Sequence, residues 1–442
     1  MRKLGKVTYD DGHQAVVISP SAWPLLSLLK WLPNFAIIAG IKTTLERKGR
    51  VFNIQNYVAA DEEKPRTTKE IRESSAFLRL LKDHNLSKSI LFSGKSVRKE
   101  LPIQTVSNPY EVAQNYENKV WIRKQFAQKI HFPEFVLVPI AELEADMFHS
   151  LATKFQSSGL VIQHPNFSGG RGTFITSSEA EMARALKVLN THLNASDEVV
   201  VSRVLDDAQE RTIQVCITDE EIFVGPPQAQ LVNDKDLTSG VEGSVKFCGG
   251  RIAKDLMSVE HYEEAVIAAQ LIGNSLRNAG YIGIFGLDLM ICKETLYVLE
   301  VNPRLTGLTA LLASLQTELP FLLLHVLMLR GARFQLDRKQ DEAKLNTGFG
   351  SFVIVYAQKD CTVNFESGLY DANLHKLSND LDFDIMPAQE DQYFVAMKRE
   401  KMTTVKAGKS LAFIYSRNQL FNESGLSDTR LEKLINRIRT SY

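Results

Sequence analysis

The sequence predicts a protein of two or three domains that combines α/β and α+β architecture. Up to about residue 115, short apolar runs alternate with helical stretches, a pattern typical of a small parallel sheet. Further along, two apolar runs of strand character, Tyr281–Cys292 and Leu296–Val301, flank the polar step Lys293–Thr295 and indicate a β-hairpin. Beyond Gly348, strand candidates are followed by a terminal helix, as in an α+β domain.

Length and composition narrow the class of protein. The chain has 442 residues, with 52 Lys and Arg against 52 Asp and Glu, so no basic field is present to recruit nucleic acid or anionic lipid. The four cysteines lie far apart without a CxxC pair, which argues against a zinc site or a disulfide framework. We therefore expect a cytoplasmic protein with no nucleic-acid partner and no membrane partner.

The first apolar segment, Ala15–Gly40, does not resemble a membrane helix. It contains three prolines and Lys30, and proline disrupts a helix interior. We expect a buried strand at Ala15–Ser19, followed by a short helix. The other strand candidates of this region are Ala36–Ala39, Val51–Ile54 and Ser89–Phe92.

One amphipathic helix is expected in the first region, at Lys69–Asp83. Its apolar face would contain Ile71, Phe77, Leu78 and Leu81. No GxGxxG motif occurs in this region, which argues against a dinucleotide site.

The middle of the chain holds a helix candidate, Asn108–Phe126, and a glycine-rich segment. The segment consists of a strand, Leu160–Gln163, the tip Ser168–Gly172 and a second strand, Thr173–Thr176. Glycines allow positive φ, so the backbone N–H groups of such a tip can turn inward around phosphate oxygens. A plain turn is the commoner meaning of a glycine-rich tip.

The remaining elements follow from periodicity and capping signals. Helices are expected at Ser178–His192, Val259–Ala279 (capped by Ser258), Thr309–Arg330 (interrupted at Pro320) and Asp428–Thr440. Strands are expected at Glu198–Leu205, Thr212–Ile217, Ser351–Tyr356, Gln392–Met397 and Ser410–Tyr415. Loops are expected at Asp206–Glu210, at Val224–Gly250 and, as a charged connector, at Phe334–Asn346. Long loops in compact domains commonly bind a substrate, so we assign Val224–Gly250 to substrate binding; a disordered surface insertion is the alternative.

The hairpin carries the most specific chemistry. If Lys293–Thr295 form a three-residue loop, Cys292 pairs with Leu296 and Asp288 lies opposite Glu300, with Cβ atoms about 5 Å apart. Two carboxylates that close repel each other unless a cation lies between them.

Asn302 shares a strand face with Glu300. The side chains of Asp288, Glu300 and Asn302 therefore present hard oxygen ligands of the kind that suits Mg²⁺. Arg304, past the strand end, can reach an anion held by that metal. The structural alternative is an edge hairpin whose carboxylates face solvent.

The run Leu299–Arg304, with Asp288 one strand upstream, resembles the metal-binding end of ATP-grasp enzymes, a group that includes biotin carboxylase, carbamoyl phosphate synthetase and the D-alanine ligases. The resemblance implies an ATP-grasp fold with a Rossmann-like domain at 1–115, an ATP-grasp domain at 116–340 with a lid at about 150–205, and a C-terminal α+β cap at 341–442. It further implies ATP and two Mg²⁺ ions (Mn²⁺ being a substitute) held by Asp288, Glu300 and Asn302, with Arg304 as the catalytic group at the transferring phosphate.

The resemblance also implies nucleotide contacts. Lys119 would bind ATP phosphate, although a solvated helix lysine is an equal alternative. The family's lysine on the strand before the glycine-rich tip is missing here, and Gln163, His164 or Arg171 would take its place. The implied cofactor-binding residues are Lys119, Gln163, His164, Ser168, Gly169, Gly170, Arg171 and Gly172 around the phosphates, Arg203, Val204 and Leu205 at the adenine, and Glu210 near the ribose.

The implied function is an ATP-dependent carboxylate–amine ligase that forms an amide or peptide bond through an acyl phosphate and releases ADP and phosphate. Two alternatives are a carboxylase acting on bicarbonate and a nucleotide-binding regulatory protein that has lost catalysis. The implied partners are a small-molecule carboxylate and an amine, with amino acids and peptides among the candidates, and a homodimer is a candidate assembly.

Overall fold

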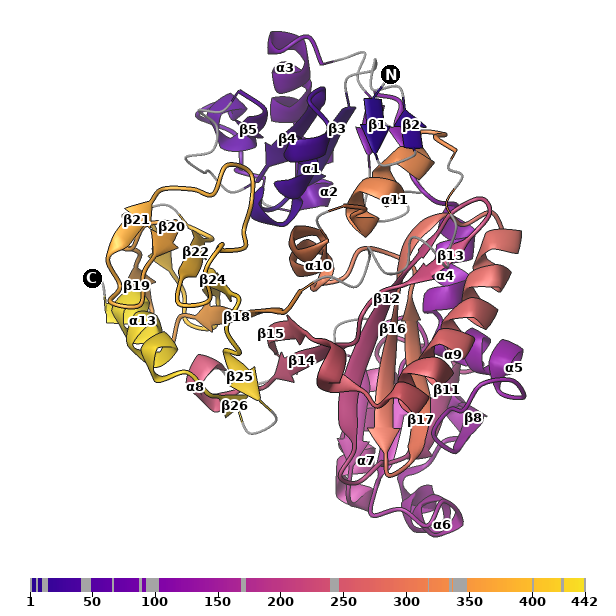
Figure 1. Ribbon diagram of the computed structural model, residues 1–442. Coiled ribbons are helices and arrows are strands. Elements are labelled where there is room, and N and C mark those ends of the chain that lie inside the picture. The colour runs from indigo at the N-terminus through magenta and orange to yellow at the C-terminus, as the bar shows by residue number, and fades with distance from the viewer. Residues whose placement is uncertain are drawn as a thin grey trace.

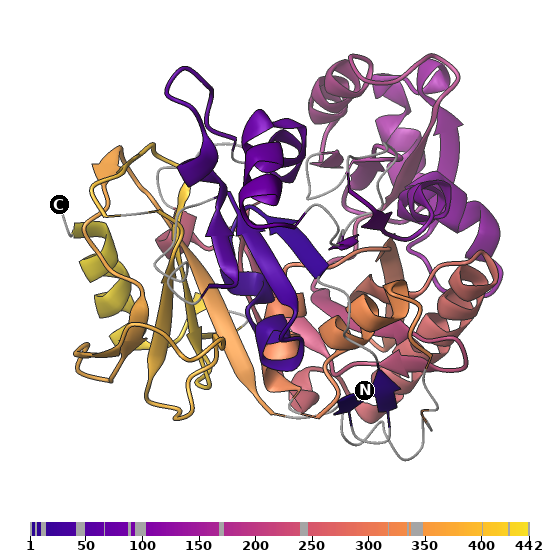
Figure 2. The same cartoon turned by 90° about the horizontal axis from the view of Figure 1, so that it is seen from above.

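The computed structural model describes residues 2–4, 7–9, 15–40, 49–65, 67–86, 90–92, 103–167, 172–238, 246–316, 318–333, 336, 348–399, 401–422 and 425–440. Figure 1 shows the N-terminal sheet at the top, the C-terminal strands on the left, and the hairpin strands of residues 283–302 with the predicted lid on the right. From above, the C-terminal strands and the lid lie on opposite sides of the molecule (Figure 2). No helix among the described residues is long and apolar enough to cross a membrane.

The N-terminal region is a parallel sheet, as predicted. Its strand order is β5-β4-β3-β6-β7, and all four strand pairs are parallel. The strands are β3 (Ala15–Ser19), β4 (Phe35–Ala39), β5 (Val51–Asn53), β6 (Ile90–Phe92) and β7 (Thr105–Val106), and the short helix α1 is Ser27–Trp31. Prediction of β3 and β4 succeeded because residues 15–18 and 35–39 are continuous runs of buried apolar residues.

The single helix predicted at Lys69–Asp83 is wrong. Two helices, α2 (Thr68–Glu73) and α3 (Ser75–Asp83), meet at Ser74, whose backbone is extended and whose side chain accepts from the backbone N–H of Phe77. A serine that caps a new helix ends the previous one. The turn in direction leaves Leu78 half exposed, whereas Ile71, Phe77 and Leu81 are buried as expected.

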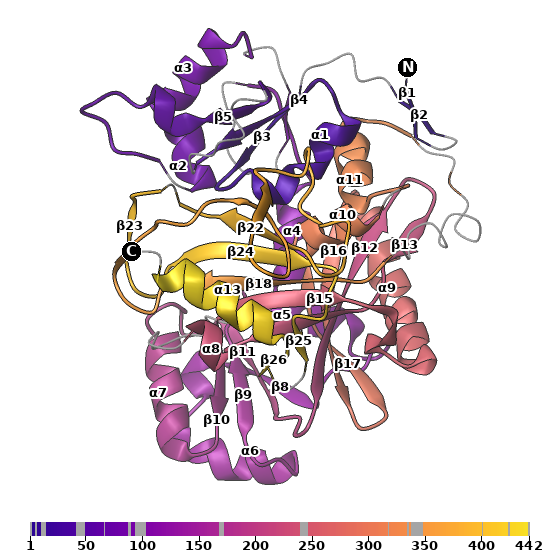
Figure 3. The ribbon, with the colours of Figure 1, turned by 60° about the vertical axis from the view of Figure 1, so that its left-hand side comes forward.

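The region predicted as a lid forms, together with β8, a four-stranded antiparallel sheet of order β10-β9-β11-β8, which lies at the bottom of Figure 3 and which we call the lid. It contains β8 (Phe135–Pro139), β9 (Leu160–Gln163), β10 (Thr173–Thr176) and β11 (Glu198–Arg203), with helices α6 (Phe148–Lys154) and α7 (Glu179–Leu189). The predicted strands and the predicted amphipathic helix are confirmed. Apolar side chains of both helices and of β9 and β11 share one core.

A second antiparallel sheet runs through most of the rest of the described chain, in the order β17-β16-β12-β14-β15-β18-β24-β22-β20-β21, with β13 beside β12. The strands are β12 (Gln209–Ile217), β13 (Ile222–Val224), β14 (Gln228–Val232), β15 (Phe247–Ile252), β16 (Gly283–Cys292), β17 (Thr295–Asn302), β18 (Gly350–Tyr356), β20 (Gly368–Tyr370), β21 (Lys376–Ser378), β22 (Tyr393–Met397) and β24 (Ser410–Ser416). Because β15 pairs with β18, the hairpin and the C-terminal strands belong to one continuous sheet.

The long loop predicted at Val224–Gly250 is wrong. Residues 228–232 and 247–252 form paired strands, and the helix α8 (Lys235–Thr238) lies between them; residues 239–245 are outside the described part. The polar sequence misled the prediction because Gln228 is a buried strand residue whose amide oxygen accepts from Gln214. The predicted polar loop at Asp206–Glu210 is likewise shorter, since β12 already begins at Gln209.

The predicted helix Asn108–Phe126 is also two helices, α4 (Tyr110–Glu117) and α5 (Lys119–Phe126). Asn118 has extended dihedrals, and its Oδ1 accepts from the N–H groups of Val120 (3.0 Å) and Trp121 (2.8 Å). This N-cap starts α5 at Lys119 and turns the chain at the point where the lysine must point inward.

The other helices follow the prediction. They are α9 (Val259–Asn278), whose cap Ser258 accepts from the N–H of His261, α10 (Thr309–Leu315), α11 (Phe321–Leu329) and α13 (Thr429–Thr440). The small strand pairs are β1 (Arg2–Leu4) with β2 (Val7–Tyr9), β19 (Cys361–Thr362) with β23 (Thr404–Val405), and β25 (Phe421–Asn422) with β26 (Gly425–Leu426). Of the predicted charged connector, residues 334–346, only residue 336 lies within the described part of the chain.

The two faces of the long sheet differ in character. Ile213 and Val215 of β12 and Leu287 of β16 pack under α9 on one face. Thr212, which alternates with them, lies on the other face together with Asp288, its partner across the strands. The polar face is therefore the place to look for a site.

Candidate metal and nucleotide site

The β16–β17 hairpin places Asp288 directly opposite Glu300, as predicted, but by a different route. Cys292 pairs with Thr295, so the turn has two residues, and Lys293 adopts φ 56°. A register shift between Asp288 and Leu289 then restores the opposition. The predicted three-residue loop is wrong, and a β-bulge near Glu300 supplies the extra residue instead.

Asn302 joins the two carboxylates. Its Nδ2 donates to Asp288 Oδ2 at 2.9 Å and, at 3.3 Å, to Glu300 Oε1. Thr212 Oγ1 donates to the other Asp288 oxygen at 3.1 Å. The three predicted metal-site residues are thus gathered in one hydrogen-bonded cluster on the polar face of the sheet.

Lys119 is buried against this cluster. Its Nζ lies 3.0 Å from Glu300 Oε2 and donates to the backbone oxygen of Phe167 at 2.7 Å. Only 4% of the residue is exposed, so the alternative of a solvated helix lysine is wrong. The contact with Phe167 also ties the start of α5 to the lid.

Arg304 is held between an acid and the cluster. Its Nε donates to Glu117 Oε1 at 2.8 Å, and its Nη2 donates to Asn302 Oδ1 at 2.6 Å. Glu117, the last residue of α4, was not predicted to belong to the site. The signal that would have found it is the helix break at Asn118, which aims the end of α4 at the hairpin.

Burial and charge set the protonation of the two carboxyl groups. Burial, reinforced by repulsion from Glu300, raises the pKa of Asp288 to about 8. Burial also acts to raise the pKa of Glu300, but attraction to Lys119 and hydrogen bonds outweigh it, so that pKa is lowered. At neutral pH the negative charge of the Asp288–Glu300 pair therefore resides on Glu300.

On the lid, Gln163 is engaged by an arginine that the sequence gave no role. Arg123 Nη2 donates to Gln163 Oε1 at 3.1 Å, and the guanidinium lies over the rings of Phe132 and Phe135. Burial lowers the pKa of Arg123 to about 10, so the side chain remains cationic at neutral pH. A buried cation therefore stands directly behind the neutral Gln163.

His164 is stacked on Phe167 with ring centroids 3.8 Å apart, and its Nδ1 accepts from the N–H of Asn166 at 3.0 Å. Burial, followed by repulsion from Lys119, lowers its pKa, so the ring is neutral. Its buried Nε2 has no hydrogen-bond partner among the described residues.

Gly172 leaves no room for a side chain, since a Cβ there would lie 2.6 Å from Phe167 Cβ. Ser168, Gly169, Gly170 and Arg171 lie outside the described residues.

The residues expected at the base and ribose lie where the lid joins the long sheet. Arg203 ends β11, and the N–H of Val204 is bonded to Ser157 Oγ at 3.0 Å; Leu205 follows in the connection. Glu210 is on β12, two residues before Thr212, so it shares the polar face with Asp288. The structure shows no direct hydrogen bond between these four residues and the Asp288 cluster.

The donor set fits a hard divalent cation. Two carboxylates and one amide oxygen converge, and Mg²⁺ is commonly held by one or two carboxylates together with substrate phosphates. No group of three or more His, Cys, Asp or Glu side chains within the described ranges could hold a metal ion. A soft, all-protein site of the zinc kind is therefore not what these residues build.

Sequence comparisons relate part of the chain to known proteins. Residues 117–308 match the model of the family described as ATP-grasp domain. Among curated proteins, the carbamoyl phosphate synthase large chain of Kineococcus radiotolerans is 27% identical over 145 residues, which is 33% of this chain and 12% of that protein. The matched segment is thus a small part of that relative.

Solved structures share the fold. The biotin carboxylase domain of Hydrogenobacter thermophilus 2-oxoglutarate carboxylase, solved with MgADP, ADP and bicarbonate, has a TM-score of 0.61 at 10% identity and covers 91% of this chain and 86% of that chain. Thermotoga maritima phosphoribosylamine–glycine ligase has a TM-score of 0.56 at 15% identity, with coverage of 96% and 95%. Rhizobium etli pyruvate carboxylase has a TM-score of 0.63 at 13% identity, with 97% of this chain covering 39% of that one. These likenesses confirm the predicted fold class.

Proposed function

Since the chain contains an ATP-grasp domain, we propose that it is an ATP-dependent ligase that joins a carboxylate to an amine through an acyl phosphate and releases ADP and phosphate. The observation that carries the proposal is the cluster of Asp288, Glu300 and Asn302, with Lys119 and Arg304 bonded to it from two other elements. Oxygen ligands and two cations at one place suit the transfer of a terminal phosphoryl group.

Asp288, Glu300 and Asn302 would hold Mg²⁺, which, when bound, neutralises charge on the phosphates of ATP. The Asn302 amide nitrogen lies between the two carboxylates and donates a hydrogen bond to each of them. Rotation of that amide exchanges the nitrogen for Oδ1 and turns Asn302 from a donor into an oxygen ligand. Only local side-chain motion would therefore be needed for the cluster to accept the metal ion.

Two cations would act on the phosphoryl group. Lys119, held beside Glu300 and the lid, would bind phosphate oxygens, and Arg304 would stabilise charge that develops as the phosphoryl group moves to the carboxylate. The lid strands would exclude water from the acyl phosphate until the amine attacks. No protein nucleophile is required for either step.

The binding of the nucleotide would extend from the cluster to the hinge. Glu210 would lie near the ribose, since it shares the polar face with Asp288, and Arg203, Val204 and Leu205 would hold the adenine. Gln163, His164 and Gly172 would face the phosphates from the lid, together with Ser168, Gly169, Gly170 and Arg171. The positive charge of Arg123 behind Gln163 would offset the absence of the lysine that this family carries on the strand.

A regulatory protein without turnover is the second candidate, because the strand of the lid presents the neutral Gln163 where a cation is expected. Two of the similar solved structures are biotin carboxylases by name, and one of them contains bicarbonate. A carboxylase that acts on bicarbonate is therefore the third candidate function.

One screen separates these functions. Phosphate release from ATP and Mg²⁺ would be measured against a matrix of amino acids and other carboxylates, with and without amines and bicarbonate. Release that requires a carboxylate and an amine together is the expected result. ATP binding with no release in any combination would favour the regulatory protein, and release with bicarbonate alone would favour the carboxylase.

A further inference from the structure

The outer face of α9 holds a cluster of exposed apolar side chains. Within the described residues eight large apolar side chains are exposed, and three of them belong to this helix: Val259 (70% exposed), Ile267 (61%) and Leu271 (37%). Exposed apolar residues that gather on one face mark an interaction surface, whereas single ones do not. Figure 3 shows α9 at the right-hand edge of the molecule, outside the strands of the long sheet.

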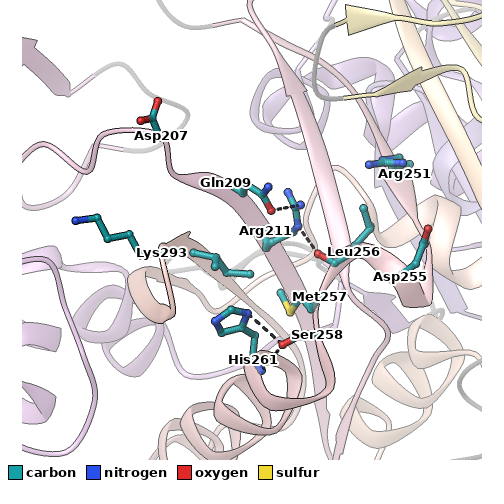
Figure 4. Close-up of a pocket in the computed structure, with 11 residues that line it drawn as sticks. Asp207, Gln209, Arg211, Arg251, Asp255, Leu256, Met257, Ser258, His261 and Lys293 are labelled. Atoms are coloured by element: carbon teal, nitrogen blue, oxygen red, sulfur yellow. Dashed lines mark hydrogen bonds between the residues drawn. The ribbon is translucent and has the colours of Figure 1, made fainter.

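The cluster belongs to a stripe that runs along the helix. Side chains three or four residues apart share one face of a helix. The exposed residues at this spacing, which we call the α9 stripe, are Glu260, Glu264, Ile267, Leu271 and Asn274. The opposite face of the helix packs against the sheet through buried residues such as Ala269 and Ile272. Ser258 fixes the start of the helix, since its Oγ accepts from the N–H of His261 at 3.2 Å (Figure 4).

Opposite charges lie at the two ends of the α9 stripe. The first half of the helix carries three exposed carboxylates, whereas its second half carries Arg277. The carboxylates are those of Glu260, Glu263 and Glu264. The guanidinium of Arg277 donates to Glu220 O at 2.7 Å and to Asn274 Oδ1 at 2.8 Å, and it forms no ion pair with a described residue. A surface that is acidic at one end and basic at the other complements a second copy of itself turned by 180°.

A small pocket beside the stripe offers room for a side chain of such a copy. Its volume is about 150 Å³. Residues Glu264, Ile267 and Ala268 form its wall on the helix, and the other wall consists of Lys129, Ile130, His131 and Leu296. In paired helices an apolar side chain of one helix inserts into a hole between several residues of the other. Antiparallel helices with Ile267 opposite Leu271 would bring Leu271 of the second copy to this pocket.

We propose that α9 is the interface of a homodimer, in which two copies of this helix pack antiparallel about a two-fold axis near Ala269. Ile267 of each copy would then lie opposite Leu271 of the other. At 1.5 Å per residue, Arg277 would lie about 3 Å along the helix axis from Glu263 of the second copy, which is within reach of an arginine side chain.

The positions around the helix agree with this register. At about 100° per residue, Glu263 and Arg277 lie on the same side of the line through Ile267 and Leu271, and a two-fold axis brings equal sides together. A parallel pair would instead place the acidic halves side by side. The interface is independent of the function proposed for the Asp288 cluster, because α9 covers the apolar face of the sheet and the cluster lies on the other face.

Sedimentation velocity of the full chain, from about 1 to about 100 μM, tests the apolar part of the proposal. Ile267→Lys places a charge at the centre of the interface. Lysine is a good helix former and would lie one turn from Glu263, so the monomer should keep its fold, which thermal unfolding checks. The matched control is Ile175→Lys, which changes a similarly exposed isoleucine on β10 of the lid.

Charge reversal tests the antiparallel register. Glu263→Arg and Arg277→Glu each place like charges together, and they do so twice, because every contact of a two-fold interface occurs twice. A mixture of the two variants restores both pairs of opposite charges in a heterodimer. The double variant, which carries both changes in one chain, restores them in a homodimer.

We expect a wild-type dimer with a dissociation constant in the micromolar range, since one helix pair makes a small interface. The dissociation constant should rise about tenfold or more in Ile267→Lys and stay within about twofold in Ile175→Lys. Each charge variant alone should dimerise about fivefold more weakly, and their mixture should return to within about twofold of the wild type. A wild type that is monomeric at every concentration, equal effects of the two lysine variants, or a mixture that stays as weak as its components would overturn the proposal.

Discussion

Arg304 donates from Nη2 to Oδ1 of Asn302, only 2.6 Å away, so the arginine holds the oxygen that Asn302 would offer to a metal ion. If Asn302 binds a metal ion, as we propose, Arg304 would be released from one of its contacts. The contact with Glu117 remains and keeps the guanidinium beside the cluster. In the proposed ligase, the ligand set and the catalytic cation would be coupled through this one hydrogen bond.

Glu300→Gln should abolish turnover and leave the fold intact. The change removes the carboxylate charge that balances Lys119 and would hold Mg²⁺, but it keeps the size of the side chain. We expect kcat to fall on the order of 10²-fold or more. The matched control is Glu294→Gln, which removes an exposed carboxylate from the turn of the same hairpin. Equal activities of the two variants would remove Glu300 from the site.

Arg304→Ala should lower kcat with little change in KM for ATP, because a charge that acts mainly in the transition state contributes little to ground-state binding. Glu117→Gln should give a smaller loss of kcat, since it weakens the contact that positions Arg304 but leaves the arginine in place. Steady-state kinetics of both variants test this. A normal kcat with a raised KM in Arg304→Ala would place the arginine in nucleotide binding instead.

Asn118→Ala should cost about 1 kcal/mol of unfolding free energy, the usual value of an N-cap. Because α5 begins at Lys119, we also expect KM for ATP to rise as the lysine loses its fixed position. Asn118→Asp retains an acceptor for the N–H groups of Val120 and Trp121 and should keep both properties. Chemical unfolding and ATP kinetics of the pair provide the measurement; an alanine variant as stable as the aspartate variant would contradict the capping role.

His325 should make the protein sensitive to acid. Its Nδ1 accepts from the N–H of Ile284 at 3.0 Å, and burial lowers its pKa to about 3. The unfolded chain then binds more protons than the folded chain between about pH 6.5 and pH 3, so stability is full above that window and falls as the pH decreases through it.

The slope from this one group is at most about 1.4 kcal/mol per pH unit. His325→Asn keeps an acceptor near the Ile284 N–H and removes the titration, so its unfolding free energy should depend less on pH between 4 and 6. Urea unfolding of both proteins across this range makes the comparison. Parallel pH profiles would show that His325 does not titrate on unfolding.

The hairpin illustrates what the sequence could predict. Alternation of apolar and polar residues identified both strands, and the spacing of Asp288 and Glu300 predicted that they face each other. The predicted loop length was wrong, yet the opposition was right, because the shorter turn and the bulge compensate. Turn chemistry and bulges depend on local φ values such as that of Lys293, which residue types alone do not determine.

The parts of the site that could not be predicted come from distant segments. Glu117 meets Arg304 across 187 positions of sequence, and Arg123 meets Gln163 across 40. Both contacts depend on the break between α4 and α5 at Asn118, which the continuous helical pattern concealed. Gln228 was assigned to a loop because polar residues are rarely buried. In the structure it pairs with β12 and β15, and the hydrogen bond from Gln214 satisfies its buried amide oxygen.

Phosphorus NMR of a working reaction tests the central claim most directly, once the phosphate-release screen has supplied the carboxylate and the amine. The cluster of Asp288, Glu300, Asn302 and Arg304 is proposed to serve attack of a carboxylate on the terminal phosphorus of ATP. The account predicts that ADP and inorganic phosphate accumulate in equal amounts as the amide forms. Accumulation of AMP and pyrophosphate would show that the carboxylate is adenylated and would contradict the account.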